Sequence, residues 1–243
     1  MTMMRVPKCA MVLAAGFGTR LRPITETLPK PLVRVAGRPL IDWALDRLVA
    51  AGVERAVVNT HHLAEMIQDH LKGRRDIEIL YSHEPEILET GGGIKQALPL
   101  LGSGPFLSVN AKILWLNGRK DALERLAESW VDDHMDALLL LHPTVTAVGY
   151  DGSGDFVMAV DGRIRRRREH EVAPFLFSGV QILHPRLFRD APDGFFSLNL
   201  LYDRTIEAGR LYAIRHDGAW FHVSTPRHLA EVEARLAETG FGR

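Results

Sequence analysis

Two hydrophobic patterns alternate along the first half of the chain. Residues 9–15 form a continuous apolar run that leads into a glycine, which is typical of a strand buried in a parallel sheet. Residues 41–51 place apolar side chains three or four positions apart, which predicts a helix that stops at Gly52. The same patterns predict strands at 55–60, 77–82, 105–110 and 137–141, and helices at 63–71, 94–101 and 121–130.

This alternation predicts an α/β fold with a mainly parallel sheet and helices on both faces. Ligands of such sheets bind beyond the carboxyl ends of the strands. The connection 131–136, which carries several aspartates, is expected to be solvated rather than metal-binding.

The second half of the chain has a different pattern. Residues 156–160 and 163–167 flank Asp161-Gly162, which predicts a β-hairpin with a two-residue turn. Strands are expected at 175–183 and 211–215. A last helix is expected at 226–237, with Thr225 as its N-cap. No repeat or linker interrupts the chain, so we expect one domain over 1–243.

Composition excludes several classes of partner. The 243 residues are 46% hydrophobic, enough for one core, and 30 basic residues balance 30 acidic ones. A net charge of zero gives no field that favours nucleic acid or a membrane surface. The lone Cys9 cannot form an internal disulfide, and neither a signal peptide nor a run of about 20 apolar residues is present. We therefore expect a cytoplasmic protein.

A glycine-rich loop follows the first predicted strand. Gly16 and Gly18 allow a sharp turn, and exposed amides in such a loop bind anions. Thr19 adds a hydroxyl and Arg20 can grip phosphate oxygens, while Lys30 is held between two prolines. A bare Gly-x-Gly after a strand is common, and the spacing matches neither the Walker loop nor the dinucleotide fingerprint.

The longer string is more specific. Residues 13–32 read Leu-Ala-Ala-Gly-Phe-Gly-Thr-Arg-Leu-Arg-Pro-Ile-Thr-Glu-Thr-Leu-Pro-Lys-Pro-Leu. This string resembles the N-terminal signature of the sugar-1-phosphate nucleotidyltransferases. The likeness continues at 36–41, 89–94, 177–180 and 220–226, and so covers almost the whole chain.

The resemblance implies a Rossmann-like fold with a nucleotide-binding half, 1–145, and a sugar-binding half, 146–243, that includes the hairpin. It implies attack of a sugar 1-phosphate on the α-phosphorus of a nucleoside triphosphate, with release of pyrophosphate. The residues it assigns to catalysis are Arg20 and Lys30. Those assigned to the nucleotide are Ala14, Ala15, Gly16, Gly18, Thr19, Gly91, Gly92 and Asn110, and those assigned to the sugar are Asp155, Ser178 and Gly179.

Two of these assignments compete with structural explanations. The triple glycine 91–93 precedes the helix expected at 94–101, and a tight turn explains it without a ligand. Beside the N-terminal signature we favour packing of the nucleoside there. Asp155 either accepts hydrogen bonds from sugar hydroxyls or serves turn chemistry.

The short chain with Glu-Thr-Gly-Gly-Gly-Ile is most similar to N-acetylmuramic acid 1-phosphate uridylyltransferases of peptidoglycan recycling. Mannose-1-phosphate guanylyltransferases are the alternative, and a catalytically weakened nucleotide- or sugar-phosphate-binding relative is a third. The resemblance implies a nucleoside triphosphate and a sugar 1-phosphate as partners, Mg²⁺ as cofactor, and a monomer or homodimer.

The resemblance breaks where the family places two metal-binding aspartates. Lys112 stands at the first position, after Asn110-Ala111, and His222 stands at the second. Mg²⁺ prefers oxygen ligands, an ammonium repels it, and imidazole suits transition metals better. Three explanations stay open: catalysis is weakened, the charge of Lys112 replaces the cation, or the metal is held by nucleotide oxygens, His222 and another carboxylate. A slip in the assignment by a residue or two would remove the difference.

The basic run 165–168 lies on the second strand of the predicted hairpin. Like charges on an exposed edge strand discourage pairing with other chains, which explains the run without a ligand. The alternative is that one or two of these arginines contact the sugar phosphate.

Overall fold

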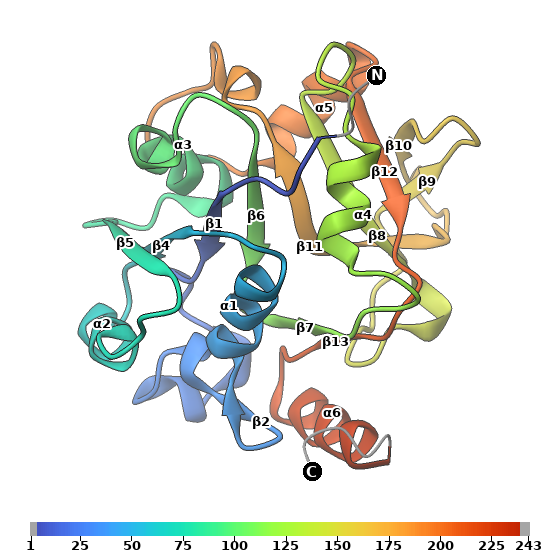
Figure 1. Ribbon diagram of the computed structural model, residues 1–243. Helices are drawn as coiled ribbons and strands as arrows, with labels where there is room; N and C mark the ends of the chain where they lie inside the picture. Colours follow the sequence, from blue (N-terminus) through green and yellow to red (C-terminus); the bar gives the residue numbers. More distant parts are fainter. Residues whose placement is uncertain (1–3, 239–243) are drawn as a thin grey trace.

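A single mixed sheet organises the computed structural model, which describes residues 4–238 (Figure 1). Nine strands of the described chain form it, with β10, β9, β11, β6, β1, β4 and β5 in spatial order and β8 joining β11 to β12. Their bounds are β1 (Cys9–Leu13), β4 (Arg55–Thr60), β5 (Glu78–His83), β6 (Phe106–Asn110), β8 (Ala137–Pro143), β9 (Phe156–Met158), β10 (Ile164–Arg166), β11 (Phe175–Leu183) and β12 (Leu211–Arg215). The expected domain 1–243 also includes 1–3 and 239–243, which lie outside the described residues.

The first half of the chain builds the parallel part of the sheet, as predicted. β1 lies between β4 and β6 and is parallel to both, with Met11 opposite Val57 on one side and Ser108 on the other. The carboxyl ends of these strands therefore meet at one edge, where Leu13 lies opposite Asn59 and Asn110. β11 then runs antiparallel to β6 and β8, so the sheet is mixed.

Helices cover both faces of the sheet, because successive strand residues point to opposite sides. In β1, Ala10 and Val12 pack into one core, and Met11 packs into the other. The first core is closed by α1 (Leu40–Ala50), α2 (Ala64–Leu71) and α4 (Ala122–Ser129). The second is closed by α3 (Glu89–Leu101) and α5 (Asn199–Glu207).

A third, smaller core includes Leu21, directly after the glycine-rich loop. Leu21, Leu40 and Phe221 belong to it, together with Val232 of α6 (Pro226–Glu238). The Thr225 hydroxyl accepts a hydrogen bond from the amide of His228 at 3.2 Å, which confirms the predicted cap. Two ribbons border this core: β2 (Arg34–Val35) with β3 (Arg38–Pro39), and β7 (Ile113–Trp115) with β13 (Trp220–His222).

Two local predictions were wrong, and several elements were not predicted. The hairpin between β9 and β10 is closed by three residues, 160–162, because the amide of Ala159 pairs with Arg163 and Gly162 takes a left-handed φ of 83°. The triple glycine lies inside α3, which begins at Glu89 rather than at residue 94. α5, β7 and β13 were not predicted.

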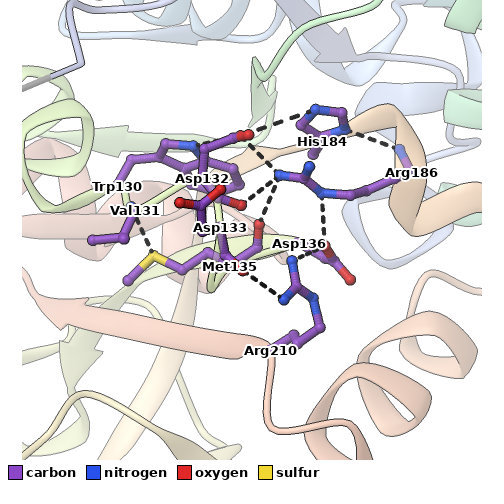
Figure 2. A network of polar contacts seen from close by, with 9 residues as sticks. All are labelled: Trp130, Val131, Asp132, Asp133, Met135, Asp136, His184, Arg186 and Arg210. Carbon is purple, nitrogen blue, oxygen red and sulfur yellow. Dashed lines mark hydrogen bonds and ion pairs between the residues drawn. The ribbon is translucent and has the colours of Figure 1, made fainter.

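The polar connection before β8 is ion-paired rather than simply solvated. Figure 2 shows Arg186 and Arg210 reaching one carboxylate, and both donate to Oδ1 of Asp136, at 2.8 and 2.9 Å. Arg186 also donates to Asp132 at 2.7 Å. These bonds tie the connection to the segments before β12 and after β11. No helix of the described chain is long and apolar enough to cross a membrane.

Candidate active site

Three hollows open beyond the carboxyl ends of the parallel strands and share lining residues. The phosphate-loop hollow has a volume of about 200 Å³, the hollow beside α3 about 180 Å³, and the hollow toward β9 and β11 about 260 Å³. Leu13 and Gly16 line the first two, and Asn110 lines the second and third. Lys112 lines all three. The glycine-rich loop and the hairpin half of the chain thus face one continuous cleft.

A buried polar chain holds the start of the glycine-rich loop. Oδ1 of Asn59 accepts a hydrogen bond from the amide of Ala14 at 2.7 Å. Nδ2 of Asn59 donates to Oε1 of Glu84 at 2.6 Å, and Oε2 of Glu84 accepts from the amide of Leu88 at 2.9 Å. Since Asn59 and Glu84 are both buried, these bonds fix the loop relative to β4 and the segment before α3.

The phosphate loop itself requires a glycine at Gly18. Its φ is 66°, and an added Cβ would lie 3.0 Å from the side chains of both Lys30 and Thr25. The Thr25 hydroxyl donates to the Gly18 carbonyl at 2.9 Å. The loop therefore turns tightly around the base of Lys30. Its hollow is lined by Ala14, Gly16, Gly18, Thr19, Arg20, Lys30 and Lys112, among others.

Lys30 is a buried cation without a partner among the described residues. It begins the 3₁₀ helix η3 (Lys30–Leu32), between the two prolines. Burial, then the charges of Lys112 and Arg20, lower its pKa to about 7. The hollow has three cations in its lining and no carboxylate. Such a group is unfavourable in the free protein and suits a polyanion.

The second hollow lies between the loop and α3. Its lining includes Asn59, Glu84, Glu89 and Thr90. The predicted contact with Gly91 and Gly92 stays a prediction, and both of their amides already donate to the carbonyl of Phe196, at 3.0 and 3.1 Å. Ala15 and Gly16 form the opposite wall.

The third hollow is lined by two of the three residues assigned to the sugar, and the third, Gly179, follows Ser178. Asp155 and Ser178 line it, and Oδ2 of Asp155 accepts from the amide of Phe177 at 2.8 Å. Gly179, at φ 87° in an irregularity of β11, leaves room for Asn110, whose Nδ2 would lie 2.8 Å from an added Cβ. Oγ of Ser178 accepts from the amide of Val180, and its carbonyl accepts from Trp220. Their contact with a sugar stays a prediction.

The basic run divides into two roles. β10 is an edge strand of the sheet, which agrees with the explanation that the like charges of the run discourage pairing with other chains. Arg165 makes two hydrogen bonds to Glu171, at 2.8 and 2.7 Å. Arg166 lines the third hollow and is held there by Asp203 and by the side chain of Asn199, at 3.0 Å from the latter. Arg166 is thus the member of the run that lines the hollow toward β9 and β11.

The residues at the family's metal positions do not fit Mg²⁺. Lys112 offers an ammonium, which cannot ligate a cation. Nε2 of His222 is buried without a hydrogen-bond partner, and an imidazole nitrogen is a poor ligand for Mg²⁺. Burial, then the charges of Lys112 and Lys30, lower the pKa of His222 to about 3, so its imidazole is neutral. Within residues 4–238 no group of three His, Cys, Asp or Glu side chains is placed to hold a metal.

Several lining residues were not predicted. Asn59, Glu84 and Thr90 line the hollow beside α3, and Tyr150, Phe177, Asn199 and Tyr202 line the hollow toward β9 and β11. A signal existed for Asn59, since it is a polar residue near the carboxyl end of a predicted parallel strand. Asn199 and Tyr202 lie on α5, a helix that the sequence analysis missed.

Comparison with known proteins agrees with this geometry. Residues 9–150 match the model of the family described as Nucleotidyl transferase. The chain is 44% identical over 241 residues to N-acetylmuramate alpha-1-phosphate uridylyltransferase of Caulobacter vibrioides, covering 97% of this chain and 100% of that one. It is 38% identical over 229 residues to the protein of that name from Neisseria meningitidis serogroup B, covering 93% and 96%.

The fold also has solved counterparts. UDP-glucose pyrophosphorylase complexed with UDP-glucose superposes with a TM-score of 0.77 at 17% identity, covering 96% of this chain and 99% of that one. This likeness confirms the Rossmann-like α/β fold. The family match and the two full-length relatives go further, and they show that this chain belongs to the nucleotidyl transferase family.

Proposed function

We propose that this chain transfers a uridylyl group from uridine triphosphate to N-acetylmuramic acid 1-phosphate and releases pyrophosphate. The observation that carries the proposal is the continuous cleft, in which an unpaired cationic phosphate loop faces a polar sugar-side hollow. The choice of base and sugar rests on the full-length likeness to two N-acetylmuramate alpha-1-phosphate uridylyltransferases. We place the reaction in the cytoplasm, where nucleoside triphosphates are made and where the single free thiol is stable.

In the proposed division of labour, residues 1–145 bind the nucleotide and residues 146–243 bind the sugar. Ala14 to Arg20 surround the phosphates, and the hollow lined by Glu84 and Thr90 receives the nucleoside. Asp155, Ser178 and Arg166 surround the sugar. Mg²⁺ then enters bound to the triphosphate, as part of the substrate, since Lys112 and His222 are poor ligands for it.

The chemical step is a displacement at phosphorus. A phosphate oxygen of the sugar 1-phosphate forms a bond to the α-phosphorus, and the bond from that phosphorus to the oxygen bridging to the β-phosphate breaks. Pyrophosphate leaves with the electron pair of that bond. Arg20 and Lys30 offset the negative charge on the phosphate oxygens, so catalysis rests on positioning and electrostatics.

The test is pyrophosphate release across a matrix of substrates. Uridine, guanosine, cytidine, adenosine and thymidine triphosphates are each combined with N-acetylmuramic acid, N-acetylglucosamine and mannose 1-phosphates. We expect the highest kcat/KM for uridine triphosphate with N-acetylmuramic acid 1-phosphate. Preference for guanosine triphosphate with mannose 1-phosphate would move the chain to the guanylyltransferases. Nucleotide binding without turnover of any pair would identify a relative that has lost catalysis.

A further inference from the structure

Lys112 occupies the junction of the cleft. It follows β6 by two residues, beyond Asn110 at the sheet edge where ligands bind. It is the only described residue that lines the phosphate-loop hollow, the hollow beside α3 and the sugar-side hollow together. A group in this position faces the place where the phosphates of the nucleotide meet the phosphate of the sugar.

The cations around Lys112 form no ion pair with a carboxylate of the described residues. Its side chain stays exposed to the solvent of the cleft, and no hydrogen bond or ion pair within residues 4–238 engages its ammonium. Desolvation of the ammonium, and then the charge of Arg20, lower its pKa from the ordinary value of lysine, and the charge of Glu89 opposes this shift. Lys30 is 8% exposed, equally unpaired, and lines the same hollow. Lys112, Lys30 and Arg20 thus line one hollow that has no carboxylate in its lining, where an anionic ligand would offset their repulsion.

The carboxylates that line the cleft do not form a metal site together with Lys112. Asp155 accepts from the amide of Phe177, and Glu84 accepts from Asn59 and from the amide of Leu88. Glu89, the carboxylate whose charge acts on Lys112, lies across the hollow beside α3. A divalent cation at Lys112 would face an ammonium instead of a ligand.

We propose that Lys112 is a phosphate-binding residue of this enzyme, contacting the nucleotide phosphates at the side that faces the sugar phosphate, where it takes the place of a protein-bound divalent ion. This inference rests on the proposed nucleotidyl transfer. In that reaction two anionic substrates must approach, and a fixed positive charge between them lowers their repulsion. The step needs no proton from Lys112, because the attacking phosphate oxygen is already deprotonated.

The experiment measures nucleotide binding without metal. Calorimetric titration of the full chain with uridine triphosphate, and with pyrophosphate, is carried out in EDTA and again with Mg²⁺. The variants are Lys112→Met and Lys112→Arg. The matched control is Lys120→Met, since Lys120 pairs with Glu128 on α4, outside the cleft lining.

We expect the parent protein to bind uridine triphosphate in EDTA. Lys112→Met should weaken that binding by about tenfold or more, since one charge-assisted contact to phosphate is lost. Lys112→Arg should retain most of the affinity, and Lys120→Met should match the parent. Because Lys112 is exposed, its variants should unfold at the parent's temperature, which circular dichroism checks.

Two outcomes would overturn the inference. The first is a parent that binds uridine triphosphate only when Mg²⁺ is present, and the second is a Lys112→Met variant that binds in EDTA as tightly as the parent. If either occurs while the parent still forms a nucleotide sugar with Mg²⁺, the proposed function stands and only the role of Lys112 falls. If neither buffer supports binding of any nucleoside triphosphate, the proposed function itself is wrong.

Discussion

The side chain of Asn59 fixes the backbone of Ala14, with 2.7 Å between Oδ1 and the Ala14 amide nitrogen. The contact exists because β4 lies parallel to β1 with Asn59 opposite Leu13, one residue before the loop. The same side chain satisfies Glu84, a buried carboxylate that no cation neutralises among the described residues. One amide thus joins the glycine-rich loop to the segment before α3.

We predict that Asn59→Ala costs about 2–3 kcal/mol of unfolding free energy, because it leaves the amide of Ala14 and Oε1 of Glu84 buried without partners. Nucleotide affinity should fall as well, since the loop loses its anchor. In the double variant with Glu84→Gln the carboxylate is neutral, and part of the stability should return. Urea denaturation of both variants measures this. A double variant less stable than the sum of its single changes would contradict the account.

Lys30 should show opposite effects on stability and binding. Lys30→Met removes an unpaired buried cation whose pKa is lowered to about 7, so the free protein should be at least as stable as the parent. Binding of uridine triphosphate should weaken by roughly 1.5–3 kcal/mol, and the same loss is expected for Arg20→Ala. Thermal unfolding and calorimetry measure the two quantities. If both variants bind and react like the parent, the loop is not the phosphate site.

The start of α3 depends on the absence of side chains. An added Cβ at Gly92 would lie 2.0 Å from the carbonyl oxygen of Gly194. Although alanine favours helices, we predict that Gly92→Ala destabilises the protein by about 1–3 kcal/mol through overpacking. Gly73→Ala is the matched control, because nothing lies within 4 Å of its added Cβ. Equal stability of the two variants in urea would refute this packing.

Residues with strong local patterns could be predicted from the sequence. The strand β1 is buried on both faces and therefore appears in the sequence as a continuous apolar run. The helix α1 is buried on one face and therefore shows apolar residues at helical spacing. β7 and β13 have three residues each, too few to show a period. The helix α5 begins with Asn199 and carries no capping side chain, so its start has no signal.

The site was predictable where a long motif exists and unpredictable where partners come from distant segments. The loop 14–20 and Lys30 lie together as the motif implies. The role of Glu84 depends on Asn59, 25 residues away, and on the order of strands in the sheet. Arg165 and Arg166 look alike in the sequence, but they are neighbours on a strand and point to opposite faces, where Glu171 engages one and α5 holds the other in the cleft.

Buried histidines should make the protein sensitive to acid. His142 is buried beside His216, and burial, then the charge of His216, lower its pKa from 6.5 to about 4. Below pH 6.5 the unfolded chain therefore takes up a proton that the folded chain refuses until about pH 4, so stability falls across this range as pH falls. His142 alone accounts for roughly 3 kcal/mol of that loss.

Thermal unfolding between pH 7.5 and pH 4 measures the effect. We expect His142→Gln to flatten the dependence of the unfolding temperature on pH relative to the parent. His134→Gln, a change at an exposed histidine, should leave the slope unchanged. A His142→Gln variant with the parent's full slope would show that the pH dependence arises elsewhere.

The last prediction concerns catalysis at Lys112. Its ammonium carries one charge where Mg²⁺ carries two, and it cannot bridge several phosphate oxygens in octahedral geometry. Stabilisation of the transition state should therefore be weaker than in relatives with a carboxylate-bound ion, so the cost appears in kcat more than in nucleotide affinity. Lys112→Asp restores a carboxylate beside Asn110 and removes the charge that repels a cation.

We expect Lys112→Asp to raise turnover at saturating Mg²⁺ and to make turnover depend more steeply on Mg²⁺ than in the parent. Its nucleotide binding in EDTA should weaken at the same time, because the phosphates lose a cation and meet an anion. Turnover of both proteins across a Mg²⁺ titration gives the result. A parent that is already fast and strictly metal-dependent, and that Lys112→Asp slows, would show that the metal is bound at another place and that Lys112 does not replace it.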